Sequence, residues 1–515
     1  MDILSTERSL VSRHPATGET LLEMRADSEE EVEAKVGSAK EAAEVWRATP
    51  LSERLTTIRR LHDRLARGAE QIAQTLSAET GRPLQESLGA EVLPTLCGLD
   101  YLCRQAPSLL KPTRLVGQRT WTLPEPYGVI GIIGTWNYPL FLNLIPLCQA
   151  LAAGNAVVWK PSELALLSAR ETQRLLESIG LPPGVVEVVY GDAEAGRALT
   201  RAECDKYLFT GGVQTGRSIL ADLARSGKPA VMELSGNDAC IVCADAPLEL
   251  AARSAVWARV SNAGQSCIAP QRFYVAKEIY GPFLQQVKLQ LEALQPHELT
   301  PLRTASARER CHRLVRDAIE HGACLLHGGE LDLEAPGSFY PPTLLAECED
   351  RFAVMAEDLF GPVIAVCPVR DDQEAVARAN AHPMALGASV WTEDRKRGEL
   401  LATQLRVGLV SVNSVLLDAA HPAVSFGGVR ASGFGKQRGA QGLEEFVVRK
   451  VVALHRQSGT PRHLFPYLPA AVPLLLATAR MRLPGGWRAA RELVQAALAW
   501  QRQWNSFHDS RKGKR

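Results

Sequence analysis

A cysteine near the middle of the chain follows a run of small, turn-forming residues that extends from Asn262 to Cys267. A thiolate is the best nucleophile among protein side chains, and this setting favours a thiol at an accessible bend. Glu233 lies 34 positions earlier, where the apolar, strand-like segment 230–234 leads into a turn of small residues. We therefore interpret Cys267 as a nucleophile and Glu233 as a general base, a pair suited to covalent catalysis.

A third candidate follows the continuous apolar run 128–134. Such a run is typical of a strand that is buried on both faces of a parallel sheet. It leads directly into Asn137, which precedes Tyr138 and Pro139. An amide at the end of a central strand can donate a hydrogen bond to a developing oxyanion without titrating. A simple turn residue is the alternative for Asn137.

Four segments occur in an order and at a spacing that resemble the aldehyde dehydrogenase superfamily over residues 10–455. They are residues 134–139, 233–236, 262–267 and 358–362. The resemblance implies an α/β fold with a Rossmann-like cofactor domain, an α/β catalytic domain and a small β oligomerisation element. It favours Asn137 as an oxyanion donor, together with the backbone amide of Cys267. The pair His421-Pro422 and the segment 81–91 lean towards the class 3, fatty aldehyde branch.

The reaction that the resemblance implies is oxidation of an aldehyde to a carboxylic acid. Cys267 adds to the carbonyl, hydride transfer to a nicotinamide leaves a thioester, and Glu233 activates the water that hydrolyses it. An ordinary thiol, with a pKa of about 8.5, is only a few per cent ionised at neutral pH, so nearby charge or a helix end must assist Cys267.

The residues for the adenosine side of the cofactor also come from the resemblance. Residues 156–160 are interpreted as a second buried strand that ends at Lys160, 23 positions after Asn137. The family has a lysine here that bonds the adenosine ribose. Glu163 would accept hydrogen bonds from the ribose hydroxyls and repel a 2′-phosphate, which predicts NAD as the cofactor, with NADP as the alternative.

Residues 206–218 are predicted to form a strand, a glycine-rich turn and a helix. Gly211 and Gly216 match the family's loop beneath the cofactor pyrophosphate, where a helix N-terminus favours an anion. The segment is superficially similar to a P-loop, but Arg217 occupies the position of the phosphate-binding lysine, so we reject a nucleotide triphosphatase. Gly212 departs from the family's usual serine.

The nicotinamide side is assigned from residues 356–362. Asp358 takes the position of a ribose-binding glutamate and is one methylene shorter, so its contact is expected to be longer or bridged by water. Phe360 is predicted to line the nicotinamide pocket, with core packing as the alternative. Ser235 crowds the turn after Glu233 and is expected to restrict rotation of that carboxylate. Phe426 is similar to the family's substrate-side aromatic residue.

Helices and an extended excursion are expected to position these groups. Residues 28–80 show helical periodicity and predict two or three surface helices that end at 81–83. Prolines across 107–127 predict an extended segment, which is either an oligomerisation hairpin of a homodimer or homotetramer or an ordinary edge hairpin. The predicted domains are an NAD-binding domain (1–107 and 128–233), a catalytic domain (234–438), an oligomerisation element (108–127 and 439–455) and a basic, Trp- and Pro-containing C-terminal extension (456–515).

Composition narrows the class of protein. A chain of 515 residues predicts two or three domains. Its net charge of +1 is typical of neither a nucleic-acid binder nor a disordered chain. The first ten residues show no signal-peptide pattern, and 11 scattered cysteines fit reduced thiols, so a cytoplasmic location is expected. Cys240 and Cys243 lie in an apolar, strand-like run without a second pair at zinc-site spacing, and we expect no metal site.

The C-terminal extension carries 11 Lys and Arg against two Asp and Glu after residue 454, a net charge of +9. Its uncharged stretch 464–479 is too short and too rich in proline for a membrane-spanning helix. Residues 487–504 predict a helix with Trp487 and Trp504 among arginines. This pattern fits peripheral contact with an anionic membrane surface or packing on a neighbouring subunit.

Two related functions remain as alternatives. A coenzyme A-acylating enzyme would not need Glu233 for hydrolysis, and a non-catalytic relative held at a membrane would be expected to lose Cys267, Glu233 or Asn137. All three residues are present. The sequence therefore favours an aldehyde dehydrogenase that acts on a small-molecule aldehyde and binds no nucleic acid.

Overall fold

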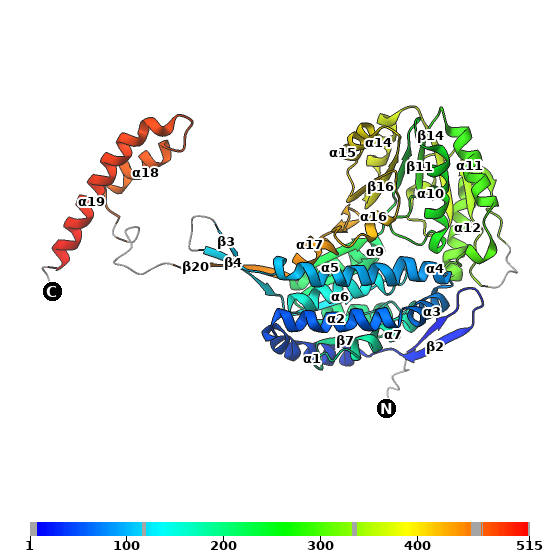
Figure 1. Cartoon of the computed structure of the whole chain (residues 1–515), viewed down its shortest axis with the longest axis horizontal. Helices are drawn as coiled ribbons and strands as arrows, with labels where there is room; N and C mark the ends of the chain where they lie inside the picture. Colours follow the sequence, from blue (N-terminus) through cyan, green and yellow to red (C-terminus); the bar gives the residue numbers. More distant parts are fainter. Residues whose placement is uncertain (1–7, 116–119, 332–336, 455–464, 466, 513–515) are drawn as a thin grey trace. The chain divides into compact units, whose positions relative to one another are not determined.

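The computed structural model describes residues 8–115, 120–331, 337–454, 465 and 467–512 (Figure 1). It divides into two compact units, one made of Met1–Thr113 with Thr122–Lys450 and the other of Arg114–Trp121 with Val451–Arg515. The candidate site lies wholly within the first unit.

The first unit opens with an antiparallel hairpin of β1 (Ser9–Arg13) and β2 (Thr20–Arg25), followed by three helices. These are α1 (Glu29–Ala48), α2 (Leu51–Arg67) and α3 (Ala69–Thr80), which confirm the predicted surface helices. A capping box between Ser28 and Glu31 starts α1, because the side chain of each residue accepts a hydrogen bond from the backbone amide of the other. The left-handed Gly81, with φ 73°, ends α3 at the predicted place.

Within the described residues, a six-stranded sheet has the order β19-β9-β8-β5-β6-β7. Its strands are β5 (Val129–Ile133), β6 (Ala156–Lys160), β7 (Val186–Val188), β8 (Lys206–Gly211), β9 (Ala230–Leu234) and β19 (Gly433–Phe434). The strands are parallel except β19, which is antiparallel to β9. From β5 the chain proceeds outward to β7 and then returns to β8 and β9. The carboxyl ends of β5 and β8 therefore flank the switch point, where doubly wound sheets bind ligands.

The connections between its parallel strands contain α6 (Phe141–Ala153), α7 (Leu166–Glu177), α8 (Ala193–Arg201) and α9 (Val213–Ser226), and α1 packs against β6 and β7. Alternate residues of β5 belong to two different apolar clusters. Ile130 and Ile132 pack in one, and Val129 and Ile133 pack in the other. The prediction of a strand buried on both faces is thus confirmed.

A second sheet has the order β12-β13-β14-β11-β10-β16-β17 among the described residues. Its strands are β10 (Ala239–Val242), β11 (Arg272–Ala276), β12 (Cys324–His327), β13 (Thr343–Ala346), β14 (Val363–Val369), β16 (Gly387–Trp391) and β17 (Leu409–Val412). Helices α10 (Leu248–Val260), α11 (Tyr280–Glu292), α12 (Ala305–Glu320), α14 (Asp372–Ala381) and α15 (Arg395–Gln404) pack with it. The pair of sheets with their helices gives the α/β class with a Rossmann-like half, as expected.

A three-stranded sheet joins β20 (Val447–Ala453), β4 (Thr120–Pro126) and β3 (Thr113–Arg114). The expected extended segment exists, but it starts later than predicted. Helix α5 (Leu93–Leu109) contains Pro107 in its last turn, where the loss of one backbone donor does not end the helix. The prediction of a break at Pro107 was therefore wrong, and the oligomerisation role of the sheet stays a prediction.

The second unit contains a helical hairpin of α18 (Ala471–Arg480) and α19 (Ala490–Lys512), joined through a 3₁₀ turn at Gly486–Ala489. A helix was expected over 487–504; the α-helix instead begins at Ala490, after the 3₁₀ turn, and continues to Lys512. Gln503 accepts a hydrogen bond from the amide of Ala470 at 2.9 Å, and Arg480 pairs with Glu492 at 2.7 Å. In the part of the chain that the structure describes, every helix is too short or too polar to cross a bilayer.

Candidate active site

A cavity of about 220 Å³ lies at the carboxyl ends of β5, β8 and β9. It is lined by Thr135, Trp136, Asn137, Leu142, Thr210, Gly211, Gly212, Glu233, Leu234, Ser235, Cys267, Asp358 and Phe360. The structure thus brings the three predicted catalytic residues together with the predicted cofactor residues Gly211, Asp358 and Phe360. Lys160, Glu163 and Gly216 lie outside its lining.

Cys267 lies in a turn and is partly exposed, as the sequence suggested. The preceding segment is strained, because Asn262 and Ala263 have φ of 49° and 52°, a conformation rarely adopted by residues other than glycine. Burial raises the pKa of the Cys267 thiol, the carboxylates of Glu233 and Asp238 raise it further, and Arg438 lowers it. The thiol therefore needs a local cation to ionise.

Glu233 is the penultimate residue of β9, paired with Gly433 of β19. Its side chain is buried, with 4% of the residue exposed, and burial raises its pKa to about 8, while Arg438 and Lys436 lower it. One carboxyl oxygen, Oε1, has no hydrogen-bond partner among the described residues. A carboxyl group with a pKa near the working pH and an unpartnered oxygen is suited to general base catalysis.

Asn137 follows the end of β5 and is held by both ends of its amide. Its Oδ1 accepts a hydrogen bond from the Thr135 hydroxyl at 2.9 Å, and its Nδ2 donates to the Gln265 carbonyl at 3.0 Å. The carbonyl of Gln265 can only accept a hydrogen bond, so the amide atom that faces it must be the nitrogen. The atom that faces the Thr135 hydroxyl is therefore the oxygen. Since Nδ2 carries two hydrogens, the second can be donated to an oxyanion in the cavity that Asn137 lines.

The predicted ribose pair lies at the carboxyl end of β6. Lys160 is buried, and its Nζ donates to the carbonyl of Pro161 at 2.9 Å and to Glu163 Oε2 at 3.5 Å. Burial lowers the pKa of Lys160, while Glu163 raises it. The Glu163 side chain is 43% exposed. A half-exposed carboxylate beside a buried cation fits a sugar with two adjacent hydroxyls.

The two predicted glycines have different surroundings. A Cβ at Gly211 would lie 2.5 Å from the ring of Phe209, so the bare backbone forms the cavity wall where β8 ends. A Cβ at Gly216 would lie 2.5 Å from a Leu234 methyl, so this glycine permits close packing of α9 on β9. The first turn of α9 begins after Gly212, beside the cavity, and its free amides fit the pyrophosphate of a dinucleotide.

Asp358 and Phe360 also line the cavity. Burial raises the pKa of Asp358, and a hydrogen bond from Ser235 lowers it, so the Ser235 hydroxyl is directed to Asp358. The adjacent Glu357 pairs instead with Arg310 at 2.8 Å. The ring of Phe360 meets Trp136 edge to face at 6.0 Å, and both line the cavity.

Sequence reasoning missed Arg438, a buried cation that interacts electrostatically with Glu233 and Cys267. Its guanidinium carbon lies 4.9 Å from the ring centre of Phe141 and 4.5 Å from that of Phe426, so it is held between two aromatic faces. Phe426, the predicted substrate-side aromatic residue, is buried in a small apolar cluster that Cys267 contacts. Nothing in the sequence distinguishes Arg438 from an exposed arginine, because one of the two rings that enclose it, Phe141, is 297 positions away.

Known proteins resemble this chain along most of its length. The model of the aldehyde dehydrogenase family matches residues 3–452. The 4,4'-diapolycopene aldehyde oxidase of Methylomonas sp is 35% identical over 85% of this chain and 84% of its own length. The betaine aldehyde dehydrogenase of Cereibacter sphaeroides is 34% identical over 85% of this chain and 92% of its own.

The fold agrees as well. The crystal structure of the aldehyde dehydrogenase of Mycobacterium tuberculosis complexed with NAD+ has a TM-score of 0.84 and 31% sequence identity to this chain, and covers 88% of this chain and 96% of its own. Both the sequence match and the fold therefore extend over the elements that build the cavity. This chain belongs to the aldehyde dehydrogenase family.

Proposed function

We propose that this protein oxidises an apolar, fatty-type aldehyde to the carboxylic acid, with NAD as the hydride acceptor. The observation that carries the proposal is the convergence of Cys267, Glu233 and Asn137 on one cavity at the switch point of the first sheet. Family membership makes the protein an oxidoreductase that acts on aldehydes. The roles of individual residues and the kind of aldehyde are our inference.

The chemistry begins when Cys267, as a thiolate, adds to the aldehyde carbon. The carbonyl oxygen becomes an oxyanion, which accepts hydrogen bonds from Asn137 Nδ2 and the amide of Cys267. NAD supplies the acceptor for the hydride that leaves the same carbon as the oxyanion collapses. A thioester remains on Cys267. Glu233 then takes a proton from water as that water attacks the thioester, and the acid leaves with the thiol restored.

The cofactor site combines three positions. Lys160 and Glu163 would hold the adenosine ribose, Gly211 at the end of β8 and the first turn of α9 would hold the pyrophosphate, and Asp358 would hold the second ribose. The exposed carboxylate of Glu163 supports NAD over NADP, because a 2′-phosphate there would be repelled. Gly216 contributes through the packing of α9, and Phe360 forms the wall beside the nicotinamide.

The kind of aldehyde is inferred from the apolar surroundings of the nucleophile. Cys267, Ile268 and Leu409 pack against the buried cluster of Leu386, Ala419 and Phe426. The two relatives are named for different aldehydes, so they favour no single substrate. The apolar cluster and the class 3 leaning of residues 81–91 and His421 support a fatty aldehyde.

The protein is also proposed to assemble as a homodimer or homotetramer through the sheet of β20, β4 and β3. The measurement is the molar mass by light scattering. A monomeric mass would refute the proposal.

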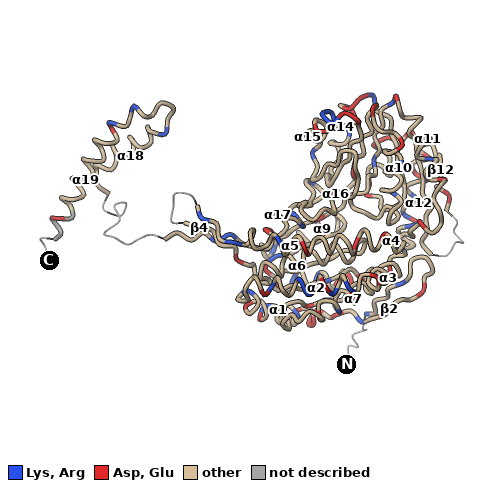
Figure 2. The backbone as a smooth tube through the Cα atoms, in the orientation of Figure 1, with Lys and Arg blue, Asp and Glu red and all other residues tan. Residues whose placement is uncertain are grey.

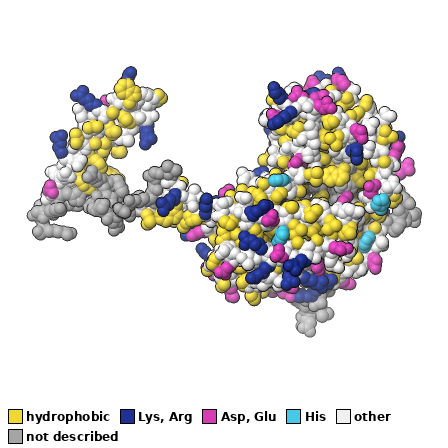
Figure 3. Space-filling model, in the orientation of Figure 1, with side chains coloured by type: hydrophobic (Ala, Val, Ile, Leu, Met, Phe, Trp, Pro, Cys, Tyr) yellow, Lys and Arg dark blue, Asp and Glu magenta, His cyan; other side chains and the backbone are white. Residues whose placement is uncertain are grey.

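The helical hairpin of the second unit is proposed to bind an anionic membrane surface. Large apolar side chains are exposed on it, and Figure 3 shows hydrophobic side chains, in yellow, along the hairpin. They are Val472, Leu475, Leu476, Leu483, Trp487, Val494 and Leu498. Arginines at 480, 482, 488, 491 and 502 accompany them (Figure 2). Trp487, 71% exposed, stands beside Arg488, whose guanidinium carbon is 5.7 Å from its ring. Exposed apolar groups among cations suit the interface of an anionic bilayer.

The test of the oxidation is NADH absorbance with purified protein, NAD and a panel of aldehydes of increasing chain length. The Cys267→Ser variant should lose turnover and keep NAD binding, measured by quenching of intrinsic fluorescence. Turnover that rises with chain length supports the fatty-aldehyde proposal. A preference for short polar aldehydes would refute it, and NADH formation that requires coenzyme A would favour the acylating alternative.

The membrane proposal is tested with the full chain and liposomes. The protein should sediment with vesicles of mixed phosphatidylserine and phosphatidylcholine and not with phosphatidylcholine alone. Deletion of 456–515 should abolish sedimentation, and Trp487→Ala should weaken it. If deletion changes the molar mass of the oligomer and the intact protein never sediments, the hairpin packs on a neighbouring subunit instead.

A further inference from the structure

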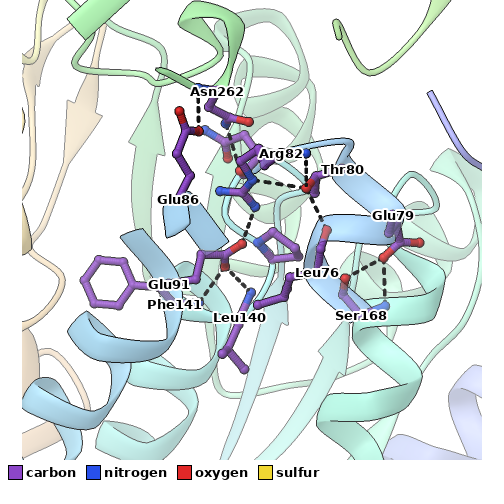
Figure 4. Close-up of polar contacts among 12 residues, drawn as sticks. Leu76, Glu79, Thr80, Arg82, Glu86, Glu91, Leu140, Phe141, Ser168 and Asn262 are labelled. Atoms are coloured by element: carbon purple, nitrogen blue, oxygen red, sulfur yellow. Dashed lines mark hydrogen bonds and ion pairs between the residues drawn. The ribbon is translucent and has the colours of Figure 1, made fainter. Parts of the chain in front are cut away.

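A buried ionic cluster of Arg82, Glu86 and Glu91, drawn in Figure 4, lies outside the lining of the cavity. Arg82 and Glu91 form an ion pair with both side chains fully buried. Arg82 Nε also donates to the Thr80 hydroxyl at 3.1 Å, and its guanidinium carbon lies 5.1 Å from the ring centre of Tyr138. A buried ion pair adds little net stability, because desolvation opposes the attraction of its charges. We therefore ask which other groups the buried pair holds in position through hydrogen bonds.

Glu91 holds the segment that carries Asn137. Its second oxygen, Oε2, accepts hydrogen bonds from the backbone amides of Leu140 at 2.7 Å and Phe141 at 3.2 Å. These amides lie at the start of α6, where the first donors of a helix need outside acceptors. The N-cap residue of α6 is Leu140, which has no polar side chain to serve as one. Glu91 thus caps α6 three residues after Asn137.

Glu86 holds the segment that carries Cys267. Its Oε2 accepts a hydrogen bond from the backbone amide of Asn262 at 3.0 Å, the first of the two strained residues before the nucleophile. Asn262 Nδ2 in turn donates to the carbonyl of Asn137 at 3.1 Å and to that of Gln265 at 3.2 Å. A left-handed conformation persists only where its surroundings hold it. Glu86 supplies one of those contacts from a distant element.

The backbone between the two carboxylates explains why they act together. Glu86 lies in the short helix α4 (Leu84–Ser87), and Glu91 lies in a π-helical turn, Leu88–Val92, that leads into α5. In a regular α-helix residues five apart point about 140° from one another, since each residue turns the helix by about 100°. A π turn bonds residues five apart and turns Glu91 towards the face of Glu86. Arg82 accordingly attracts both carboxylates.

We infer that Arg82, Glu86 and Glu91 form an ionic bracket that fixes the oxyanion donor and the nucleophile relative to each other. Glu91 fixes the Asn137 segment and Glu86 fixes the Cys267 segment, while Arg82 forms an ion pair with Glu91 and attracts the charge of Glu86. None of the three lines the cavity, so Glu86 and Glu91 are positioning residues rather than catalytic ones. The bracket rests on the proposed roles of Cys267 and Asn137.

The bracket predicts a defect in the first chemical step. Glu86→Leu keeps the bulk of the side chain and removes the acceptor of the Asn262 amide, whereas Glu86→Gln keeps a carbonyl oxygen there. The rate constant of the NADH burst per active site should fall roughly 10- to 100-fold in Glu86→Leu, as for a reacting group displaced by about 1 Å. It should stay near the wild-type value in Glu86→Gln, and KM for NAD should be unchanged in both.

Glu79 offers a matched control, because it is also buried and caps a helix elsewhere. Its carboxylate accepts hydrogen bonds from the backbone amides of Leu167 at 2.8 Å and Ser168 at 2.7 Å, at the start of α7. Glu79→Leu should lower the melting temperature and leave the burst rate constant per active site at the wild-type value. An equal loss in Glu79→Leu, a wild-type burst in Glu86→Leu, or a Glu86→Gln variant as slow as Glu86→Leu would each overturn the bracket.

Alkylation of Cys267 by iodoacetamide, followed by peptide mass spectrometry, provides a readout that needs neither NAD nor aldehyde. Release of the Asn262 segment should make alkylation several-fold faster in Glu86→Leu than in wild type and Glu86→Gln. A wild-type protein that forms no NADH would refute the proposed function, and the alkylation rates would still decide the bracket. Equal rates in all three proteins would refute the bracket alone.

Discussion

Replacement of Arg438 should move the pH profile of aldehyde oxidation without lowering its plateau. Arg438 is buried between Phe141 and Phe426 and attracts the charged forms of both Glu233 and Cys267. Arg438→Met removes this charge and keeps a long, flexible side chain between the two rings. Arg438→Lys keeps the charge and serves as the matched control.

The magnitude follows from the state of Glu233. Its pKa of about 8 already includes the attraction of Arg438. Loss of a nearby opposite charge raises a carboxyl pKa by roughly one unit or more. The sign is upward, because the deprotonated form loses its cation. At pH 7, well below either value, a one-unit rise reduces the fraction of ionised Glu233 about tenfold, since each unit is a factor of ten.

The assay is kcat from pH 6 to 10 by NADH absorbance, under conditions in which hydrolysis of the thioester limits turnover. The acidic limb of the kcat profile should be centred near pH 8 for wild type and Arg438→Lys. For Arg438→Met, kcat should reach the same plateau at a higher pH. A limb at the wild-type position in Arg438→Met would refute the electrostatic role. A lower plateau at every pH would show that Arg438 acts through packing instead.

Three further results are expected from the residues of the cavity. Glu233→Gln should give a burst of NADH followed by slow turnover; normal steady-state turnover would contradict its role as base. Burial raises the pKa of Glu233 from 4.5 to about 8, so the wild-type native state loses stability as pH rises through that window. Glu233→Gln does not titrate there and should therefore be more stable than wild type by up to about 5 kcal/mol at pH 9 and by nothing at pH 4. Urea denaturation measures this difference in the free energy of unfolding. Thr135→Val leaves Asn137 Oδ1 without its 2.9 Å donor and should slow the burst roughly tenfold with unchanged KM for NAD; an unchanged burst would show that Gln265 alone orients the amide.

The sequence predicted those parts of the site whose chemistry is local. Cys267, Glu233 and Asn137 were found because each follows a short pattern, a small-residue bend or an apolar run that ends at a polar group. Runs such as 128–134 predicted buried strands, since both faces of a parallel strand need apolar residues. Within this local range errors were small, as at Pro107, where a single missing donor did not end α5.

The sequence could not predict the supports of these residues, because they depend on contacts between distant segments. Glu86 and Asn262 are 176 positions apart, and a carboxylate in an amphipathic stretch is usually exposed to solvent. Arg438 lies in a glycine-rich loop with nothing local to indicate its burial between two rings. The Ser235 hydroxyl was expected to restrict Glu233, but which neighbour it bonds is decided by the Asp358 segment, 123 positions later.

Glu86 and Arg438 act on different properties of the same step, so a double variant separates them. Glu86 holds a backbone amide by a hydrogen bond, and its loss should lower the plateau of the burst rate at every pH. Arg438 acts through charge, and because it also attracts the Cys267 thiolate, its loss should move the acidic limb of the burst rate. The double variant Glu86→Leu/Arg438→Met should therefore combine the lowered plateau of Glu86→Leu with the shifted acidic limb of Arg438→Met. The coupling energy between the two substitutions should be below about 0.5 kcal/mol, as for sites without shared partners. A larger coupling energy would mean that the bracket also affects the ionisation of Cys267, so that the same contacts would set both the position and the pKa of the thiol.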